Sequence, residues 1–141
     1  MGKRVRLQDD CVLIDDKPTI LLASSLFYFR IPQEYWYTRM KQLKVAGYNA
    51  IDVYFPWNFH ELNPGEWCFD GMRDVGLFLE MASREKLYVI ARPGPYICSE
   101  WDGGGIPAWL DQEKHRLRQY DDEYLKAVSR WMDRIMPIIS K

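Results

Sequence analysis

Three short apolar runs, each followed by a segment with helical periodicity, most restrict the fold of this 141-residue chain. The runs are residues 20–23, 50–55 and 87–91, and they are rich in the aliphatic and aromatic residues of buried strands. A continuously apolar strand needs cover on both faces, which is typical of parallel sheets packed under helices. The sequence therefore predicts an α/β protein with a parallel sheet, preceded by a short extended run at residues 12–14.

The segments between the runs predict two amphipathic helices. From Glu34 onward, Trp36, Met40 and Leu43 repeat at i, i+4 and i+7, and Gly47 follows where a C-terminal glycine belongs. Asp74 is a candidate N-cap for the second helix. The apolar face of that helix consists of Val75, Phe78, Leu79 and Ala82.

A third helix is predicted from about Asp121, after a long glycine-containing loop. Pro137 is expected to disturb its last turn, because proline donates no backbone hydrogen bond. The predicted apolar face consists of Leu125, Val128, Met132, Ile135 and Ile139.

Two architectures share this alternation of strand and helix. A doubly wound nucleotide-binding sheet should have a glycine-rich turn after its first strand, but residues 24–28 contain no glycine. A (β/α)8 (TIM) barrel places its active site in the loops that follow the strands, and polar and aromatic residues cluster there. A complete barrel takes about 250 residues, so residues 1–141 are expected to form one partial domain of about three βα units.

Composition argues against several classes of function. A net charge of −1 provides no basic surplus for nucleic acid or an anionic membrane, and Lys3, Arg4 and Arg6 are interpreted as a solvated terminus. Neither an export signal nor a spanning segment is recognisable, so a cytoplasmic protein is expected.

Cysteine and histidine spacing gives no reason to expect a metal or a cofactor. Cys11, Cys68 and Cys98 are widely spaced and are interpreted as free thiols, while His60 and His115 lie far apart in the sequence. The aromatic share, in contrast, reaches 15%. Flat rings and carboxylates in loops are typical of sites that stack sugars and hydrogen-bond their hydroxyls.

Four blocks carry a resemblance to a known family. Residues 28–32 read YFRIP, residues 54–61 YFPWNFHE, residues 92–102 RPGPYICSEWD and residues 104–110 GGIPAWL. In this order they resemble motifs of family 35 of the glycoside hydrolases, the β-galactosidase family, over residues 12–131. The resemblance implies a (β/α)8 catalytic domain that removes terminal β-linked galactose with retention of configuration, without a metal or organic cofactor.

The resemblance also implies a division of the active site. Retention requires two carboxyl groups about 5 to 5.5 Å apart. In the family these glutamates follow strands four and seven, so they are expected beyond Lys141 and no catalytic residue is expected in this chain. The residues expected to contact galactose or a β-galactoside are Tyr54, Ile97, Cys98, Ser99 and Glu100.

Other polar and aromatic residues of these blocks have plainer interpretations. Arg30 and Arg92 are interpreted as structural ion-pair partners of the acidic residues Glu61, Glu100 and Asp102. For Trp57, Asn58 and Trp101 both a structural role and a binding role stay open. Ser24, Phe27 and Gly103 depart from the family pattern, and Phe27 stands where the family commonly has histidine.

Two further readings stay open. The chain could be a non-catalytic carbohydrate-binding or partner-binding remnant of such an enzyme, and the open edges of a three-unit sheet would then favour homo-oligomers. Another barrel glycosidase is also conceivable, although it would not explain the block at residues 92–110.

Overall fold

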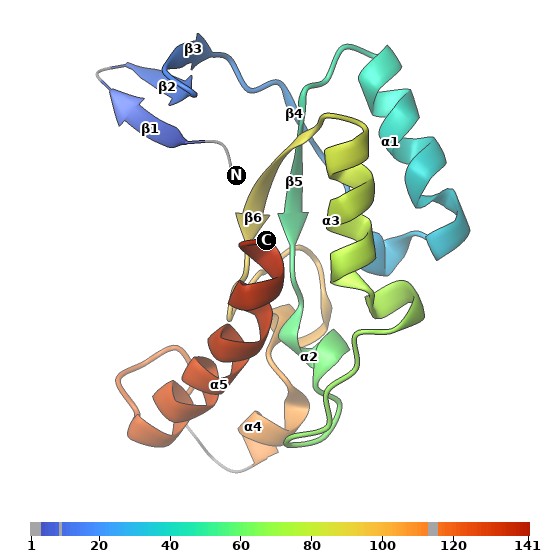
Figure 1. Cartoon of the computed structure of the whole chain (residues 1–141). Helices are drawn as coiled ribbons and strands as arrows, with labels where there is room; N and C mark the ends of the chain where they lie inside the picture. Colours follow the sequence, from blue (N-terminus) through green and yellow to red (C-terminus); the bar gives the residue numbers. More distant parts are fainter. Residues whose placement is uncertain (1–3, 9, 113–115) are drawn as a thin grey trace.

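The computed structural model describes residues 4–8, 10–112 and 116–141, which form a mixed α/β structure (Figure 1). Lys3 and His115, considered above, lie outside the described residues. An antiparallel sheet has the order β1-β2-β3, with bounds Val5–Gln8, Cys11–Ile14 and Lys17–Thr19. A parallel sheet has the order β4-β5-β6, with bounds Ala23–Ser25, Ala50–Tyr54 and Tyr88–Arg92.

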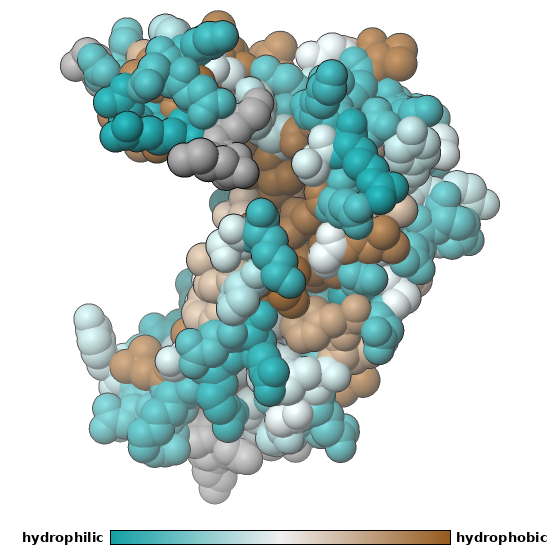
Figure 2. All heavy atoms as spheres, in the orientation of Figure 1, coloured by the Kyte–Doolittle hydropathy of each residue, from teal (hydrophilic) through white to brown (hydrophobic). Residues whose placement is uncertain are grey.

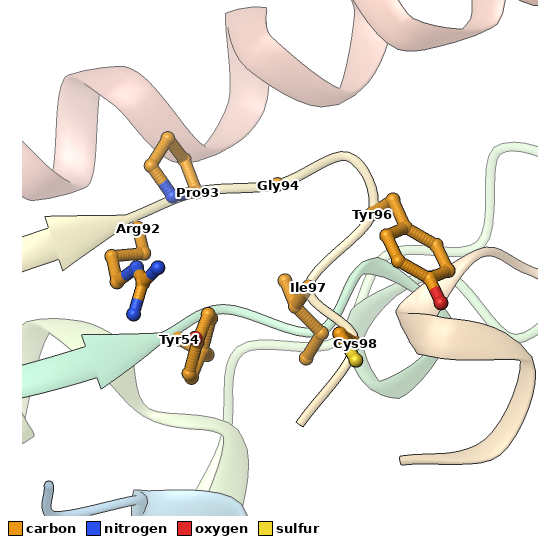
Figure 3. A pocket seen from close by; sticks show the side chains of 7 residues that line it. All are labelled: Tyr54, Arg92, Pro93, Gly94, Tyr96, Ile97 and Cys98. Atoms are coloured by element: carbon orange, nitrogen blue, oxygen red, sulfur yellow. The ribbon is translucent and has the colours of Figure 1, made fainter. Parts of the chain in front are cut away.

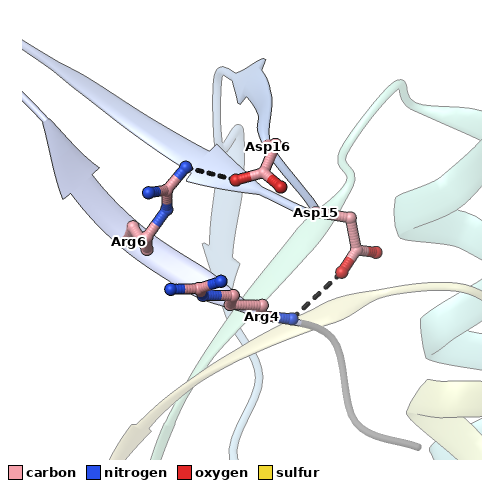
Figure 4. Close-up of polar contacts among 4 residues, drawn as sticks. All are labelled: Arg4, Arg6, Asp15 and Asp16. Carbon is pink, nitrogen blue, oxygen red and sulfur yellow. Dashed lines mark hydrogen bonds and ion pairs between the residues drawn. The ribbon is translucent and has the colours of Figure 1, made fainter.

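A two-residue turn connects β2 to β3 in the antiparallel sheet. Asp15 and Asp16 have φ values of 51° and 62°, the left-handed conformation that tight hairpin turns require at both positions. The Arg4 backbone N–H donates to Asp15 Oδ1 at 3.0 Å, and the Arg6 guanidinium pairs with the Asp16 carboxylate (Figure 4). Because the Arg6 and Asp16 side chains are 44% and 66% exposed, their ion pair adds little stability.

Helices lie between and after the parallel strands as predicted. Helix α1 (Trp36–Val45) connects β4 to β5, α3 (Val75–Arg84) connects β5 to β6, and α5 (Asp122–Ile139) follows β6. Helix α3 contacts both α1 and α5, so the three helices follow one another along the sheet (Figure 1). The three parallel strands are consecutive in sequence, an order that a barrel and one half of a doubly wound sheet share.

Side chains alternate between the two faces of the parallel sheet. Ile51 and Val53 of β5 are completely buried in the core beneath the helices. On the opposite face, Asp52 lies beside Ser25 of β4 and Ile90 of β6. Figure 2 shows the molecule hollowed between the antiparallel sheet and α5, beside the parallel strands.

The first predicted strand is misplaced. Ile20 and Leu22 are 80% and 55% exposed, and the strand that pairs with β5 begins only at Ala23. The Leu22 carbonyl accepts from the backbone N–H groups of Asn49 and Ala50, and the Asn49 side chain makes two further bonds to this segment. Asn49 Nδ2 donates to the Ile20 carbonyl and Asn49 Oδ1 accepts from the Leu22 N–H, each at 2.8 Å.

Helices α1 and α3 end in the same backbone motif, which is formed by different residues. Gly47 after α1 has a φ of 95°, and Lys86 occupies the equivalent position after α3 with a φ of 55°. In both cases the N–H of this residue and the N–H of the next residue donate to carbonyls of the last helical turn, as in a Schellman motif. At the start of α3, Asp74 Oδ1 accepts from the Leu77 N–H at 2.8 Å, which confirms the predicted N-cap.

Helix α5 is turned slightly from its predicted orientation. Its buried residues are Tyr124, Ala127, Trp131 and Ile135, whereas Leu125 is 42% exposed. The helix also continues through Pro137 to Ile139, so the expected disturbance of the last turn is wrong.

Stacked tryptophan rings fix the orientation of α5. The Trp131 ring lies 6.1 Å from that of Trp57 with an interplanar angle of 11°, and 6.2 Å from that of Trp67 at 13°. Trp57 begins the short helix α2 (Trp57–His60), and Trp67 belongs to the following loop. A bulky aromatic cluster therefore joins α5 to α2 and to the loop that follows α2.

Candidate functional site

A cavity of about 370 Å³ opens where β5 and β6 end (Figure 3). Tyr54 is the last residue of β5 and Arg92 the last of β6, so the parallel register brings them side by side. The remaining lining residues belong to the segment that follows β6: Pro93, Gly94, Tyr96, Ile97 and Cys98.

Three of the five residues predicted to contact sugar share this cavity. Tyr54, Ile97 and Cys98 line it, although Tyr54 lies more than forty residues before the other two in sequence. Ser99 and Glu100 come directly after Cys98 and are not among the lining residues. The structure thus gathers Tyr54 and the start of the predicted 97–100 segment at one point.

Asp52 binds Arg92, one of the residues that line the cavity. Arg92 Nη1 donates to Asp52 Oδ2 at 3.3 Å, and the Arg92 guanidinium lies 4.4 Å from the centre of the Tyr54 ring. Asp52 Oδ1 is buried and has no hydrogen-bond partner within the described ranges. The sequence interpretation, which paired Arg92 with Glu61, Glu100 or Asp102, is therefore wrong about the partner. An aspartate inside an apolar strand run was the signal that could have found it.

Residues 98–100 hold an uncommon backbone conformation. Cys98, Ser99 and Glu100 have φ values of 59°, 53° and 43°, all in the left-handed region. For non-glycine residues this conformation costs about 1 kcal/mol or more each, so surrounding contacts must maintain it. The Arg30 guanidinium supplies two of these contacts, because Nη2 donates to the Ser99 carbonyl at 2.5 Å and to the Glu100 carbonyl at 3.0 Å. Arg30 thus bonds to backbone carbonyls here, not to the predicted carboxylates.

Asn58, which belongs to α2, makes two hydrogen bonds to the end of the same loop. Its Oδ1 accepts from Trp101 Nε1 at 2.8 Å, and its Nδ2 donates to the Asp102 carbonyl at 2.9 Å. Asn58 and Trp101, whose roles the sequence left open, are therefore bonded to each other. Gly104 lies so close to Tyr96 that an added Cβ would come within 2.0 Å of the ring.

A buried polar cluster surrounds His60. His60 is completely buried between the Cys68 carbonyl, 2.9 Å from Nδ1, and the Tyr28 hydroxyl, 2.6 Å from Nε2. Since a carbonyl can only accept, Nδ1 carries the proton and Nε2 accepts from the tyrosine. Burial, with a smaller contribution from the charge of Arg73, lowers the pKa of His60 to about 4. Burial also raises the pKa of Tyr28 well above its usual value.

Glu61 and Trp57 belong to the same interior. Both are completely buried, and Trp57 Nε1 donates to Glu61 Oε2 at 2.5 Å. The other carboxylate oxygen accepts from the Gly65 N–H at 2.7 Å. Glu61 therefore stabilises the turn at residues 61–65 and is not among the residues that line the cavity. Trp57 contributes to the core.

Phe27 contacts the candidate sugar-binding tyrosine directly. Its ring centre lies 5.4 Å from that of Tyr54 and 5.4 Å from that of Phe29, on which it stacks. An apolar ring thus packs against Tyr54 at the position where the family commonly has histidine.

The cavity lining provides groups that can bind a ligand but no carboxyl group. It combines tyrosine rings, a guanidinium and a thiol. Across the described parts of the chain, no group of three or more side chains is arranged to hold a metal ion. In those same parts, no helix is long and apolar enough to cross a membrane.

Comparison with known proteins places the chain in a family. Residues 11–141 match the family described as glycosyl hydrolases family 35. A Mus musculus protein named "Beta-galactosidase" is 49% identical over 129 residues, which cover 91% of this chain and 20% of that protein. The Felis catus protein of the same name is 49% identical over 126 residues, covering 89% and 19%. A Mus musculus "Beta-galactosidase-1-like protein" is 42% identical over 133 residues, covering 94% and 21%.

The chain spans about a fifth of the length of these curated relatives. The family match, in contrast, covers all but the first ten residues of the chain, including every segment that builds the cavity. This chain belongs to family 35 of the glycosyl hydrolases.

Proposed function

We propose that the chain forms the galactose-binding part of the active site of a retaining β-galactosidase-type glycoside hydrolase. The observation that carries the proposal is the cavity at the ends of β5 and β6, lined by Tyr54, Ile97 and Cys98. Relatives that share nearly half of the aligned residues are named β-galactosidases. No metal or organic cofactor is part of the proposal.

Each proposed sugar contact has a chemical basis. The Tyr54 hydroxyl can donate to and accept from a sugar hydroxyl, and Cys98 offers a polarisable surface to the ring. An ionised Glu100 accepts two hydrogen bonds and can bind adjacent hydroxyls together. An epimer that fails to supply one of these donors leaves the carboxylate unpaired, which is costly, so Glu100 and Ser99 would select galactose.

The proposed chemistry needs two carboxyl groups that the cavity lining does not contain. One acts as acid/base and the other as nucleophile, about 5 to 5.5 Å apart. We place both outside these 141 residues, on later strands of a (β/α)8 barrel. The consecutive order β4-β5-β6 and the position of the cavity at the strand ends support a barrel.

Titration calorimetry with methyl β-galactoside tests the proposed binding site. We expect binding, weaker binding of methyl β-glucoside, and roughly a tenfold or greater loss of affinity in Glu100→Gln, which removes a charged acceptor. Glu80→Gln is the matched control, because Glu80 is an exposed glutamate on α3 paired only with Arg84 in the described contacts. Equal affinity of wild type and Glu100→Gln would count against the role of Glu100, and no binding by wild type would refute the proposed site.

A hydrolysis assay with a chromogenic β-galactoside tests whether the catalytic pair lies outside these 141 residues. We expect no turnover by the 141-residue chain, because a single carboxylate cannot serve as both acid/base and nucleophile. Measurable hydrolysis that survives purification to constant specific activity would show that the catalytic pair lies within the chain.

The lack of a carboxyl group in the cavity lining favours one second candidate, a carbohydrate-binding role without hydrolysis. The mass of the protein isolated from its natural source separates the two. A mass near that of the curated relatives would favour the enzyme. A mass of 16.8 kDa, together with galactose binding, would favour the binding role.

A further inference from the structure

Arg30 is the one side chain that joins the segment after β4 to the backbone of residues 98–100 by hydrogen bonds in the described contacts. Its guanidinium binds two consecutive carbonyls, those of Ser99 and Glu100, about seventy positions away in sequence. Both bonds are charge-assisted and come from the same nitrogen, Nη2, whose two hydrogens lie in the fixed plane of the guanidinium.

Three aromatic rings hold the guanidinium in place. Its central carbon lies 5.6 Å from the ring centres of both Phe27 and Phe29, and 5.8 Å from that of Trp101. These distances lie within the range of cation–π attraction. Trp101 and Phe29 also contact each other edge to face at 4.6 Å. An exposed arginine would otherwise sample many rotamers, and this cage restricts it to the geometry that reaches the loop.

The loop needs such a restraint. Three successive non-glycine residues in the left-handed region relax toward ordinary conformations unless other contacts hold them. Asn58 restrains residues 101 and 102, and the Ile97 N–H donates to the Gly104 carbonyl at 2.8 Å across the base of the loop. The Trp101 N–H donates to the Cys98 carbonyl at 3.1 Å, and Arg30 is the described contact on the carbonyls of Ser99 and Glu100.

We infer that Arg30 is a positioning residue that clamps the backbone of residues 99 and 100, and so aims the Ser99 and Glu100 side chains at the bound sugar. The second half of this inference rests on the proposed galactose site. The clamp itself does not, and it can be measured without a ligand.

Hydrogen exchange of the loop amides tests the clamp in the 141-residue chain. In Arg30→Gln, amides of residues 96–105 should exchange about tenfold faster, since two charge-assisted bonds no longer oppose local opening. Amides of β5 should keep their wild-type rates. Arg30→Lys retains a positive donor without the planar fork, so it should restore part of the protection. Arg84→Gln removes an exposed arginine that pairs with Glu80 on α3, and it should leave the loop unchanged.

The pattern of exchange decides between clamping and general stabilisation. Loop exchange in Arg30→Gln that equals that of Arg84→Gln overturns the clamp. Acceleration that spreads equally to β5 also overturns it, because this indicates global destabilisation. If Arg30→Gln does not fold, Arg30→Lys carries the same comparison with a smaller expected change.

Calorimetric titration with methyl β-galactoside tests the aiming of the side chains. Affinity should fall about tenfold in Arg30→Gln and recover partly in Arg30→Lys, in parallel with loop exchange. Faster loop exchange with unchanged affinity would overturn the positioning role. Wild-type protein that does not bind would refute the proposed galactose site and with it the aiming role, whereas exchange would still decide whether Arg30 clamps the loop.

Discussion

Acidification should destabilise this fold through His60. The imidazole is completely buried, donates from Nδ1 to a carbonyl and accepts at Nε2 from the Tyr28 hydroxyl. A second ring proton would displace the proton of that hydroxyl and bring an unpaired charge into the core. These constraints agree with a pKa of about 4, below the ordinary value of 6.5.

The size of the effect follows from the two pKa values. The unfolded chain binds the His60 proton more tightly than the folded chain, so this contribution to stability is complete above about pH 6.5 and is lost as the pH falls toward 4. Each pKa unit corresponds to about 1.4 kcal/mol, so the whole contribution is about 3 kcal/mol, and most of it is lost between pH 7 and pH 4.5. Domains are stable by about 5–15 kcal/mol, so such a loss is readily measured.

Urea unfolding from pH 4.5 to pH 7.5 measures the effect when wild type is compared with His60→Gln. Carboxyl groups titrate in both proteins, so the difference between the two slopes isolates the imidazole. The wild-type slope should be the steeper, by the amount given above. An NMR titration reports the pKa directly, because the chain has only two histidines. A His60 resonance that titrates near pH 6.5, or parallel slopes in the two proteins, would refute the reasoning.

Three other predictions concern the helix ends and the cavity loop. Lys86→Gly should raise the free energy of unfolding by about 0.5–1 kcal/mol, because glycine adopts the left-handed C′ conformation without strain. Gly47→Ala should lower the free energy of unfolding by about 1 kcal/mol, although no atom blocks the added methyl group. The melting temperatures of the two variants should therefore shift in opposite directions. Asp74→Ala should cost about 1 kcal/mol through loss of the α3 cap, and an unchanged melting curve would contradict this. Gly104→Ala should displace the Tyr96 ring and weaken methyl β-galactoside binding in calorimetry, and wild-type affinity would exclude that coupling.

Elements set by local pattern were predictable from the sequence, and those set by distant partners were not. The apolar runs gave β5 and β6, and helical periodicity with Asp74 and Gly47 gave α3 and α1, because propensity, capping and burial agree there. The four residues of β1 alternate between apolar and polar but are all exposed, and a run this short is too weak a signal to predict a strand. The start of β4 was misplaced because the Asn49 side chain takes the hydrogen bonds of the preceding apolar residues.

That three of the predicted residues meet at one cavity followed from the sequence, their contacts with a sugar stay a prediction, and the supporting contacts were less predictable. Tyr54, Ile97 and Cys98 meet because parallel strands end at one edge, a rule that needs no side-chain geometry. The pairing of Arg92 with Asp52 depends on strand register, which the sequence does not state. Residues 98–100 contain no glycine, so the sequence did not predict their left-handed conformation. Their contact with Arg30 depends on the three-dimensional structure.

The parallel tryptophans give the molecule an optical signature of its own. Indole transitions couple when rings stack at close range, and Trp131 lies within 6.2 Å of both Trp57 and Trp67 in nearly the same plane orientation. That coupling exists only while α5 rests on α2 and its loop, whether or not α5 itself stays helical. Circular dichroism of the aromatic bands can therefore report the undocking of α5 separately from the loss of helix seen in the amide bands.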